Sequence, residues 1–367
     1  AVSKEIRKRE TGFINVEVLE ACLPAFLGRD RVTVASVDSA PLNVGTSGAE
    51  LHSVTVNSDA APEPLKLLLK ISPPESTSET CFYRDLAAQV PLSTPRLVAS
   101  GTHGRRTWML LEWIEARPHH SWTDADYRVV VEDMARLHGS FWNRLEHVRR
   151  DWLTDLTDSR TLARRTGRLL EDLDTIERSW PREAVPGVFT PERLERIRVV
   201  VVEMGAIVAR LCHPGVTLVH GDYWFYNVLL TGSGRRVLVD WQDPMIFSGF
   251  WELTYFMNLL LPLREGYRDI PVSESLLVSW YRSALRAEGV DLDQADFDTA
   301  LARARVVQVP AHWVPQLARA VVRPRAIQNS DLLPATRFLT HTFDQWDASL
   351  VTAEPWANSP RNERSTR

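Results

Sequence analysis

Two patterns of apolar residues divide the chain into a strand-rich first third and a helix-rich remainder. Residues 13–27 repeat apolar positions with helical spacing, and a second helix is predicted near 76–89. Alternating or continuous apolar runs predict five strands, at 31–37, 51–56, 65–71, 95–100 and 107–114. The polar, proline-containing segment 115–120 follows, and the strand signal nearly vanishes beyond it.

The remainder of the chain is predicted to be helical, apart from one hairpin. Helices are predicted at 124–142, 161–179, 191–212, 250–261, 273–288, 293–308 and 331–350. An apolar lead-in at 216–219 precedes two further short apolar runs, which a Gly-Ser-Gly turn at 232–234 joins into the hairpin. We therefore predict an α+β fold of two lobes, with a β-rich lobe over 1–113, a helical lobe over 114–357 and a disordered tail over 358–367.

Composition and charge narrow the function classes. The chain is 44% hydrophobic and 25% charged, as in ordinary globular proteins, and its net charge of -4 argues against a nucleic-acid partner. The three scattered cysteines indicate neither a disulfide framework nor a zinc site, which fits a reducing cytoplasm. The first ten residues lack a signal-peptide core, and the most apolar stretch, 199–211, is too short to span a membrane. We expect a cytoplasmic protein with no membrane partner.

One stretch carries the strongest chemical signal: His220-Gly-Asp222-Tyr-Trp-Phe-Tyr-Asn227, followed by a strand-like run that ends at Asp240. The hairpin predicted here would bring Asp222, Asn227 and Asp240 around one point. Two carboxylates and an amide oxygen are hard ligands suited to Mg²⁺, which in such sites usually also contacts substrate phosphates. The stretch therefore indicates phosphoryl transfer.

Two features of the first lobe bear on the same chemistry. Lys70 follows an apolar triplet within the predicted strand 65–71, so its ammonium group should need an anionic partner. Glu79, on the next predicted helix, is one candidate; the alternative is that Glu79 forms a capping box with Ser76. The Gly- and Ser-containing loop 41–49 would fold over phosphates through its backbone N–H groups, or form a plain hairpin turn. It lacks the ending of a Walker loop and the strand-to-helix setting of a dinucleotide fingerprint.

The spacing within the central stretch has a mechanistic reason. His-x-Asp, four residues and then Asn is the spacing of a kinase catalytic loop. In such a loop the Asp accepts the proton of the attacking hydroxyl group, while the Asn reaches back to the metal ion. Asp240, after the next strand, would then be the main magnesium ligand.

These motifs resemble the aminoglycoside phosphotransferase and choline kinase superfamily, which has a protein-kinase-like fold. Within it, the aromatic residue after His-Gly-Asp and the Asp240-Trp-Gln sequence are similar to the ecdysteroid-kinase-like branch. The segments around His138 and Glu79 also resemble helices of that superfamily. The resemblance covers about residues 41 to 260.

The resemblance implies roles for individual residues. Asp222 would be the catalytic carboxylate, and Asn227 and Asp240 would bind Mg²⁺. Lys70, held by Glu79, would contact the phosphates of ATP, with GTP as an open alternative. The remaining nucleotide contacts implied by the resemblance come from the loop residues Gly45, Thr46, Ser47 and Gly48, from Met109 at the back of the adenine pocket, and from the backbone of Glu112, Trp113 and Ile114.

Two departures from the family pattern inform the prediction. Gly221 replaces the Arg of protein kinases, and no Asp-Phe-Gly or Ala-Pro-Glu segment is present, which favours a small-molecule kinase over a protein kinase. Glu252 stands where the family often has Asp and is expected to brace the catalytic loop. His220 is expected to brace the loop by hydrogen bonding, and His138 to be a packed helix residue outside the site.

The acceptor is the least determined part of the prediction. Aromatic residues within 223–226 would stack on a ring-bearing alcohol, although at least half of them are expected to be core residues. Asp291, Asp293, Asp296 and Asp298 would suit a cationic aminoglycoside, or simply begin a helix. We expect a small natural product, antibiotic, sugar or sterol-like alcohol as partner; the alternative is a nucleotide-binding pseudokinase that acts as a scaffold.

Overall fold

The structure is a computed structural model that describes residues 12–42, 48–73, 77–179, 190–263, 272–322 and 332–352. Its contacts divide the chain into two compact units. The first contains residues 1–117 and 226–244, and the second contains residues 118–225 and 245–367. Each unit is described by itself below.

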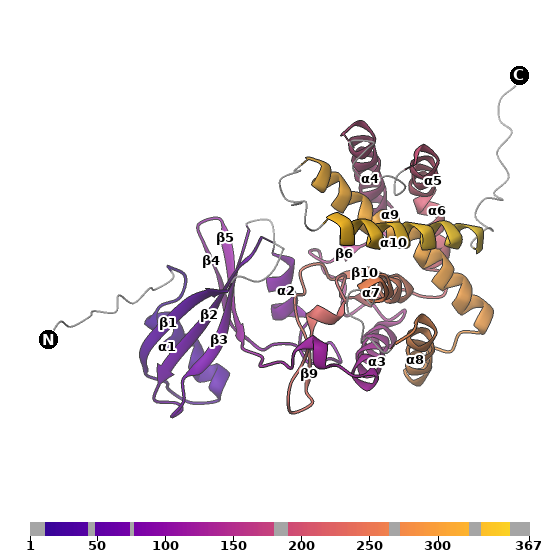
Figure 1. Ribbon diagram of the computed structural model, residues 1–367. Coiled ribbons are helices and arrows are strands. Elements are labelled where there is room, and N and C mark those ends of the chain that lie inside the picture. Colours follow the sequence, from indigo (N-terminus) through magenta and orange to yellow (C-terminus); the bar gives the residue numbers. More distant parts are fainter. Residues whose placement is uncertain are drawn as a thin grey trace, which may run out of the picture. The chain divides into compact units, whose positions relative to one another are not determined.

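The first unit is built on a five-stranded antiparallel sheet (Figure 1). Its strands are β1 (Val34–Leu42), β2 (Glu50–Ser58), β3 (Leu65–Ser72), β4 (Leu97–His103) and β5 (Arg106–Glu112), and their order in the sheet is β1-β2-β3-β5-β4. Helix α1 (Val16–Leu27) begins where the side chain of Asn15 accepts the backbone N–H of Val18, and it ends at Gly28, whose φ of 64° favours glycine.

The core of this unit lies between α1 and one face of the sheet. Leu19 and Leu23 of α1 are fully buried against Leu67 and Leu69 of β3. Burying such a side chain stabilises the fold by roughly 1.5–3 kcal/mol. Because successive side chains of a strand point to opposite faces, Lys70 points away from this core.

Two smaller elements complete the first unit. Helix α2 (Ser78–Asp85) follows β3, and strands β8 (Val228–Leu230) and β9 (Arg236–Leu238) form the hairpin predicted from the sequence. Isolated bridges join this hairpin to the rest of the unit, at Ser93 with Val237 and at Ala116 with Thr231. The hairpin that follows the His220–Asn227 stretch therefore packs with the β-rich unit.

The second unit is mainly helical. Its helices are α3 (Asp124–Phe141), α4 (Ser159–Ser179), α5 (Pro191–Val202), α6 (Met204–Leu211), α7 (Gly249–Leu263), α8 (Glu274–Ala287), α9 (Gln294–Val322) and α10 (Leu332–Thr352). A small sheet has the strand order β6 (Thr154–Asp155), β10 (Met245–Phe247) and β7 (Thr217–Val219). Helix α9 packs against α4, α6, α7 and α10 (Figure 1). Within the described segments, no helix is long and apolar enough to cross a membrane.

The predicted α+β fold, with a β-rich part and a larger helical part, is confirmed. Two helix predictions were wrong. The helix expected over 191–212 is interrupted at Glu203, where ψ is 3°. Helix α9 continues past the expected end at 308, through Pro310 and Pro315. Its packing against neighbouring helices outweighs the low helix propensity of these two prolines. The predicted boundary at 113/114 stays a prediction, and residues 358–367 lie outside the described residues.

Candidate functional site

In the first unit, Lys70 lies between two carboxylates. Its Nζ is 2.6 Å from Oε2 of Glu79 and 2.5 Å from Oδ1 of Asp240. The lysine is 6% exposed and Glu79 is 2% exposed, so the pair is shielded from water. The partnership expected between Lys70 and Glu79 is present. The alternative cap at Ser76 lies outside the described residues, and the N-cap of α2 is Thr77, without a side-chain capping bond.

The electrostatics of this cluster reflect one cation facing two anions. Burial alone would lower the pKa of Lys70, but the charges of Glu79 and Asp240 outweigh it and raise that pKa. Burial raises the pKa of Glu79 to about 7, with the charge of Lys70 opposing the rise and that of Asp240 adding to it. Tyr83 nearby is fully buried, and its hydroxyl has no hydrogen-bond partner among the described residues. The cluster therefore has an excess of negative charge that a cation would offset.

Asp240 is held in an unusual backbone conformation. Its φ is 65°, in the left-handed region that Asp adopts more readily than most other residues, at a cost on the order of 1 kcal/mol. The side-chain amide of Gln242 donates to Oδ1 of Asp240, the same oxygen that Lys70 contacts. A strained, doubly hydrogen-bonded carboxylate is typical of a functional position.

Asn227 lies beside Asp240 in the hairpin register. The backbone N–H of Val239 donates to the carbonyl oxygen of Asn227 at 2.9 Å, so Asp240 follows the residue paired with Asn227. The two side chains supply an amide and a carboxylate oxygen, the donor types that Mg²⁺ prefers when phosphates complete its coordination. The described segments contain no cluster of three or more His, Cys, Asp or Glu side chains that would form a closed metal cage. The residues present thus fit a magnesium ion shared with a nucleotide.

The predicted adenine segment follows strand β5. Met109 is buried, and its Cα pairs with that of Lys70 across β3 and β5. The backbone N–H of Glu112 already donates to the carbonyl of Arg96, so this group of the predicted set is used within the protein. Trp113 and Ile114 remain as candidate backbone contacts. Residues 45–47 of the predicted phosphate loop lie outside the described residues; Gly48 has a φ of 76°.

The loop that carries Asp222 belongs to the second unit, where Glu252 of α7 holds its backbone. The Glu252 carboxylate accepts the N–H of His220 at 3.1 Å and that of Gly221 at 2.6 Å. Gly221 has a φ of 87°, a conformation that suits glycine and would strain the Arg of protein kinases. The bracing role expected of Glu252 is therefore present in the structure.

Glu252 is itself anchored by His138, which was expected only to pack in its helix. Nε2 of His138 lies 2.9 Å from Oε2 of Glu252, and Nδ1 lies 2.8 Å from the Tyr281 hydroxyl. A neutral imidazole satisfies both contacts when Nε2 donates to the carboxylate and Nδ1 accepts from the tyrosine hydroxyl. A Cβ at Gly249 would lie 2.6 Å from Nδ1 of His138, which explains the glycine at the start of α7. This buried chain of hydrogen bonds fixes the loop from behind.

Asp222 is positioned by two contacts of its own. Its backbone N–H donates to Nδ1 of His220 at 3.2 Å, so His220 braces the loop as expected. The Tyr255 hydroxyl donates a short hydrogen bond to Oδ1 of Asp222. Sequence reasoning missed Tyr255. The sequence places Tyr255 three residues after Glu252, which puts both side chains on one face of the predicted helix. Tyr255 could therefore have been expected near the loop that Glu252 holds.

Two of the four aromatic residues of the central stretch, and Trp241 after it, are core residues. Tyr223, Phe225 and Trp241 are each at most 3% exposed, and Trp241 stacks on Phe82 with ring centroids 3.9 Å apart. The acidic cluster expected either to bind cations or to begin a helix does the latter: Asp293 accepts the backbone N–H of Asp296 at 2.7 Å. The acidic cluster therefore gives no support for a polycationic acceptor. Trp224 is half-buried and Tyr226 is exposed, and stacking of an acceptor ring on them stays a prediction.

Comparison with solved structures identifies a kinase-like fold. An aminoglycoside phosphotransferase from Alicyclobacillus acidocaldarius subsp. acidocaldarius gives a TM-score of 0.52 at 15% identity, covering 86% of this chain and 91% of that one. An ethanolamine kinase from Plasmodium vivax gives 0.52 at 11% identity, covering 86% and 84%. A choline kinase from Streptococcus pneumoniae gives 0.50 at 12% identity, covering 92% and 98%. At these identities the likeness establishes the fold alone.

The comparison with family models is more specific. No curated protein matches the sequence. A model of the phosphotransferase enzyme family matches residues 44–269, a span that includes Lys70, Asp222 and Asp240. Since these residues make up more than half of the chain, the protein belongs to the phosphotransferase enzyme family.

Proposed function

We propose that this protein is a small-molecule kinase that transfers the γ-phosphate of ATP to a hydroxyl group in a magnesium-dependent reaction. The observation that carries the proposal is the buried Lys70, held between Glu79 and Asp240. A lysine fixed in this way presents a point charge to phosphate oxygens, and desolvation of the cluster strengthens that attraction. The family match supports phosphotransfer chemistry.

Each residue of the first unit has one task in this proposal. Lys70 contacts the phosphates that remain with the nucleotide, and Glu79 keeps the ammonium group in place. Asn227 and Asp240 hold Mg²⁺, which when bound supplies positive charge against the phosphate oxygens. Met109, Trp113 and Ile114 form the adenine side, and Gly45 to Gly48 cover the phosphates.

The second unit supplies the base in this proposal. Asp222 orients the acceptor hydroxyl and accepts its proton as the oxygen attacks the γ-phosphorus. The hydroxyl hydrogen of Tyr255 occupies one carboxylate oxygen and so fixes the direction of the other. Glu252 and His138 keep the loop in place without touching the substrate.

Individual residues favour a particular acceptor, family branch, nucleotide and cellular location. Gly221 favours a small alcohol over a protein acceptor, and the aromatic residue after Asp222 favours the ecdysteroid-kinase-like branch. ATP is proposed as the donor, with GTP as an alternative. Free Cys22, Cys81 and Cys212 fit a cytoplasmic location. The intact set of Lys70, Asp222, Asn227 and Asp240 argues against a pseudokinase.

A transfer assay tests this proposal. ATP labelled in its γ-phosphate is incubated with Mg²⁺ and a panel of antibiotics, sugars, sterols and small alcohols, using wild type, Asp222→Asn and Asp240→Asn. We expect label on at least one alcohol with wild type and its loss in both variants. Asp243→Asn, an exposed turn residue three positions after Asp240, is the matched control and should retain transfer. Nucleotide binding without transfer to any alcohol would favour the scaffold.

A further inference from the structure

A groove in the second unit is lined largely by arginines. It has a volume of about 440 Å³ and lies beside α4 and the Pro315 part of α9. Its lining residues are Thr154, Leu156, Thr161, Arg164, Arg165, Arg168, Leu169, Asp172 and Pro315. Three guanidinium groups thus face one carboxylate. Burial raises the pKa of that carboxylate, Asp172, while the charge of Arg319 opposes the rise. The groove is large enough for a small ligand and carries net positive charge.

The arginines of the groove are concentrated in the first half of α4. The first turn of this helix contains no acidic residue, and Arg160, Arg164, Arg165 and Arg168 all precede its first acid, Glu171. The helix dipole acts mainly within the first turn, and Arg164, Arg165 and Arg168 lie beyond it, so the dipole does not explain their presence. Arg164 and Arg168 are exposed, so packing does not explain them either. An anion bound in the groove would offset the mutual repulsion of these like charges.

Side chains of the second unit connect this groove to Asp222. Pro315 lines the groove, and His312 lies one turn earlier on α9. The His312 ring stands edge-on to Tyr255, with centroids 4.9 Å apart, and Tyr255 donates to Asp222. Burial, together with the charges of Arg319 and Arg165, lowers the pKa of His312 to about 4. Arg165, a groove residue, makes the smallest of these three contributions, and it places one groove charge within electrostatic reach of His312.

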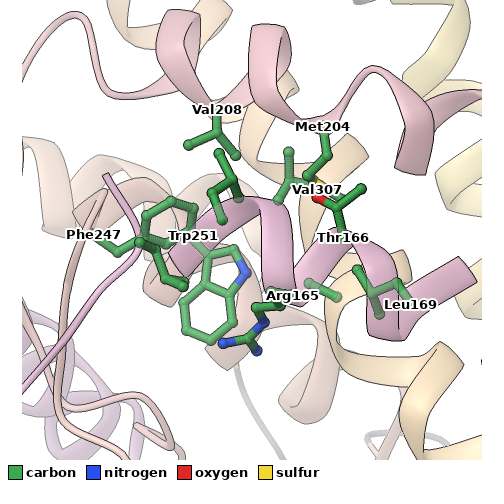
Figure 2. Close-up of a pocket in the computed structure, with 11 residues that line it drawn as sticks. Arg165, Thr166, Leu169, Met204, Val208, Phe247, Trp251 and Val307 are labelled. Carbon is green, nitrogen blue, oxygen red and sulfur yellow. The ribbon is translucent and has the colours of Figure 1, made fainter. Parts of the chain in front are cut away.

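A second, smaller cavity adjoins the groove and shares Leu156, Arg165 and Leu169 with it. Its volume of about 20 Å³ admits a water molecule but no acceptor. Figure 2 shows the indole nitrogen of Trp251 turned toward the side of the cavity where Arg165 and Leu169 lie. This N–H is buried and has no hydrogen-bond partner among the described residues. A cavity of this size gives the N–H room for a water molecule as its partner.

We propose that the acceptor of this kinase carries an anionic group, such as a carboxylate, sulfate or phosphate, which binds the groove arginines Arg164, Arg165 and Arg168. Its hydroxyl group then extends past His312 and Tyr255 toward Asp222. This inference rests on the proposed kinase function and specifies its substrate class: an anionic alcohol, opposite in charge to an aminoglycoside or choline. Arginine suits the task because its planar fork binds such oxyanions through two parallel hydrogen bonds.

Three matched probes test the inference: 4-(hydroxymethyl)benzoate, benzyl alcohol and 4-(aminomethyl)benzyl alcohol, which differ in charge but share the ring and the hydroxyl. Binding at millimolar concentration is followed by ligand-detected NMR without nucleotide, and phosphorylation is measured separately with Mg²⁺ and ATP. The variants are Arg165→Gln and Arg164→Gln/Arg168→Gln. Arg178→Gln, an exposed arginine on the same helix outside the groove, is the control.

The carboxylate probe should bind in preference to the other two, and the groove variants should weaken its binding by about 10- to 100-fold. The control should bind as wild type does. Absence of carboxylate binding, equal binding of the three alcohols or unchanged binding in the groove variants would overturn the inference. Phosphorylation of alcohols without an anionic preference would sustain the kinase function alone. Selective, arginine-dependent binding without any phosphorylation would sustain the groove and refute the kinase function.

Discussion

The carboxylate of Glu252 accepts the backbone N–H of Gly221 at 2.6 Å, immediately before Asp222 in the chain. A glutamine at this position keeps the shape but places an amide donor against one of the donors that the carboxylate now accepts. We expect Glu252→Gln to lower kcat by about 100-fold through misplacement of Asp222, with little change in the KM for ATP. Steady-state kinetics separate the two constants. A variant with unchanged kcat would show that the loop holds its shape without Glu252.

Tyr255 orients Asp222 through its hydroxyl group, and removal of that oxygen atom tests this role. Tyr255→Phe loses the hydrogen bond to Asp222 but keeps the ring between Trp251 and His312. Since a hydrogen bond to a charged group contributes about 1.5–3 kcal/mol, kcat should fall by about 10-fold or more while the free energy of unfolding changes less. Tyr226→Phe, at an exposed position near the same loop, is the control. Equal losses of kcat in both variants would remove Tyr255 from the account.

The Lys70–Glu79 pair predicts non-additive effects on stability. Lys70→Met leaves Glu79 buried without its cation, which should lower the free energy of unfolding by about 3–5 kcal/mol. The double variant Lys70→Met/Glu79→Gln removes the isolated charge and should recover part of that loss. Denaturant unfolding measures both. Both variants should also raise the KM for ATP, and additive losses of stability would argue against a coupled pair.

His312 predicts a pH dependence of stability. The pKa of His312 is about 4 in the folded protein, whereas an ordinary histidine has a pKa of 6.5. Between pH 4 and 6.5 the unfolded chain therefore binds the proton more readily than the folded protein does. The contribution of neutral His312 to the free energy of unfolding is therefore fully present above pH 6.5 and decreases as the pH falls toward 4. His312→Gln should flatten the unfolding curve in this window, whereas His341→Gln at an exposed position should leave it unchanged. Identical profiles for wild type and His312→Gln would contradict the burial of this ring.

Local patterns were sufficient to predict the strands and the Lys70 partnership. A lysine at the end of an apolar run must be buried, and burial requires an anion, so Glu79 could be expected from its position on the next helix. The hairpin of β8 and β9 was likewise encoded in two apolar runs and a glycine-containing turn. These features depend on neighbours that are close in the chain or on simple alternation.

Contacts between distant segments could not be predicted in the same way. Tyr255 reaches Asp222 across 33 positions, and His138 reaches Glu252 across 114, which no periodicity encodes. The length of α9 was underestimated because packing stabilises it through two prolines. The aromatic residues near Asp222 suggested ring stacking, but most of them are buried in the core. The arginine groove depends on three-dimensional packing of α4 and α9 and had no separate signal in the sequence.

The most direct test of the central claim compares nucleotide binding with phosphate transfer in Asp222→Asn. Magnesium–ATP affinity is measured by calorimetry, and transfer to the preferred alcohol by single-turnover kinetics. We predict affinity within about twofold of wild type and a transfer rate lower by about 10²- to 10⁴-fold, the range that general base catalysis provides. Transfer at the wild-type rate by Asp222→Asn would contradict the assignment of this carboxylate and the mechanism built on it.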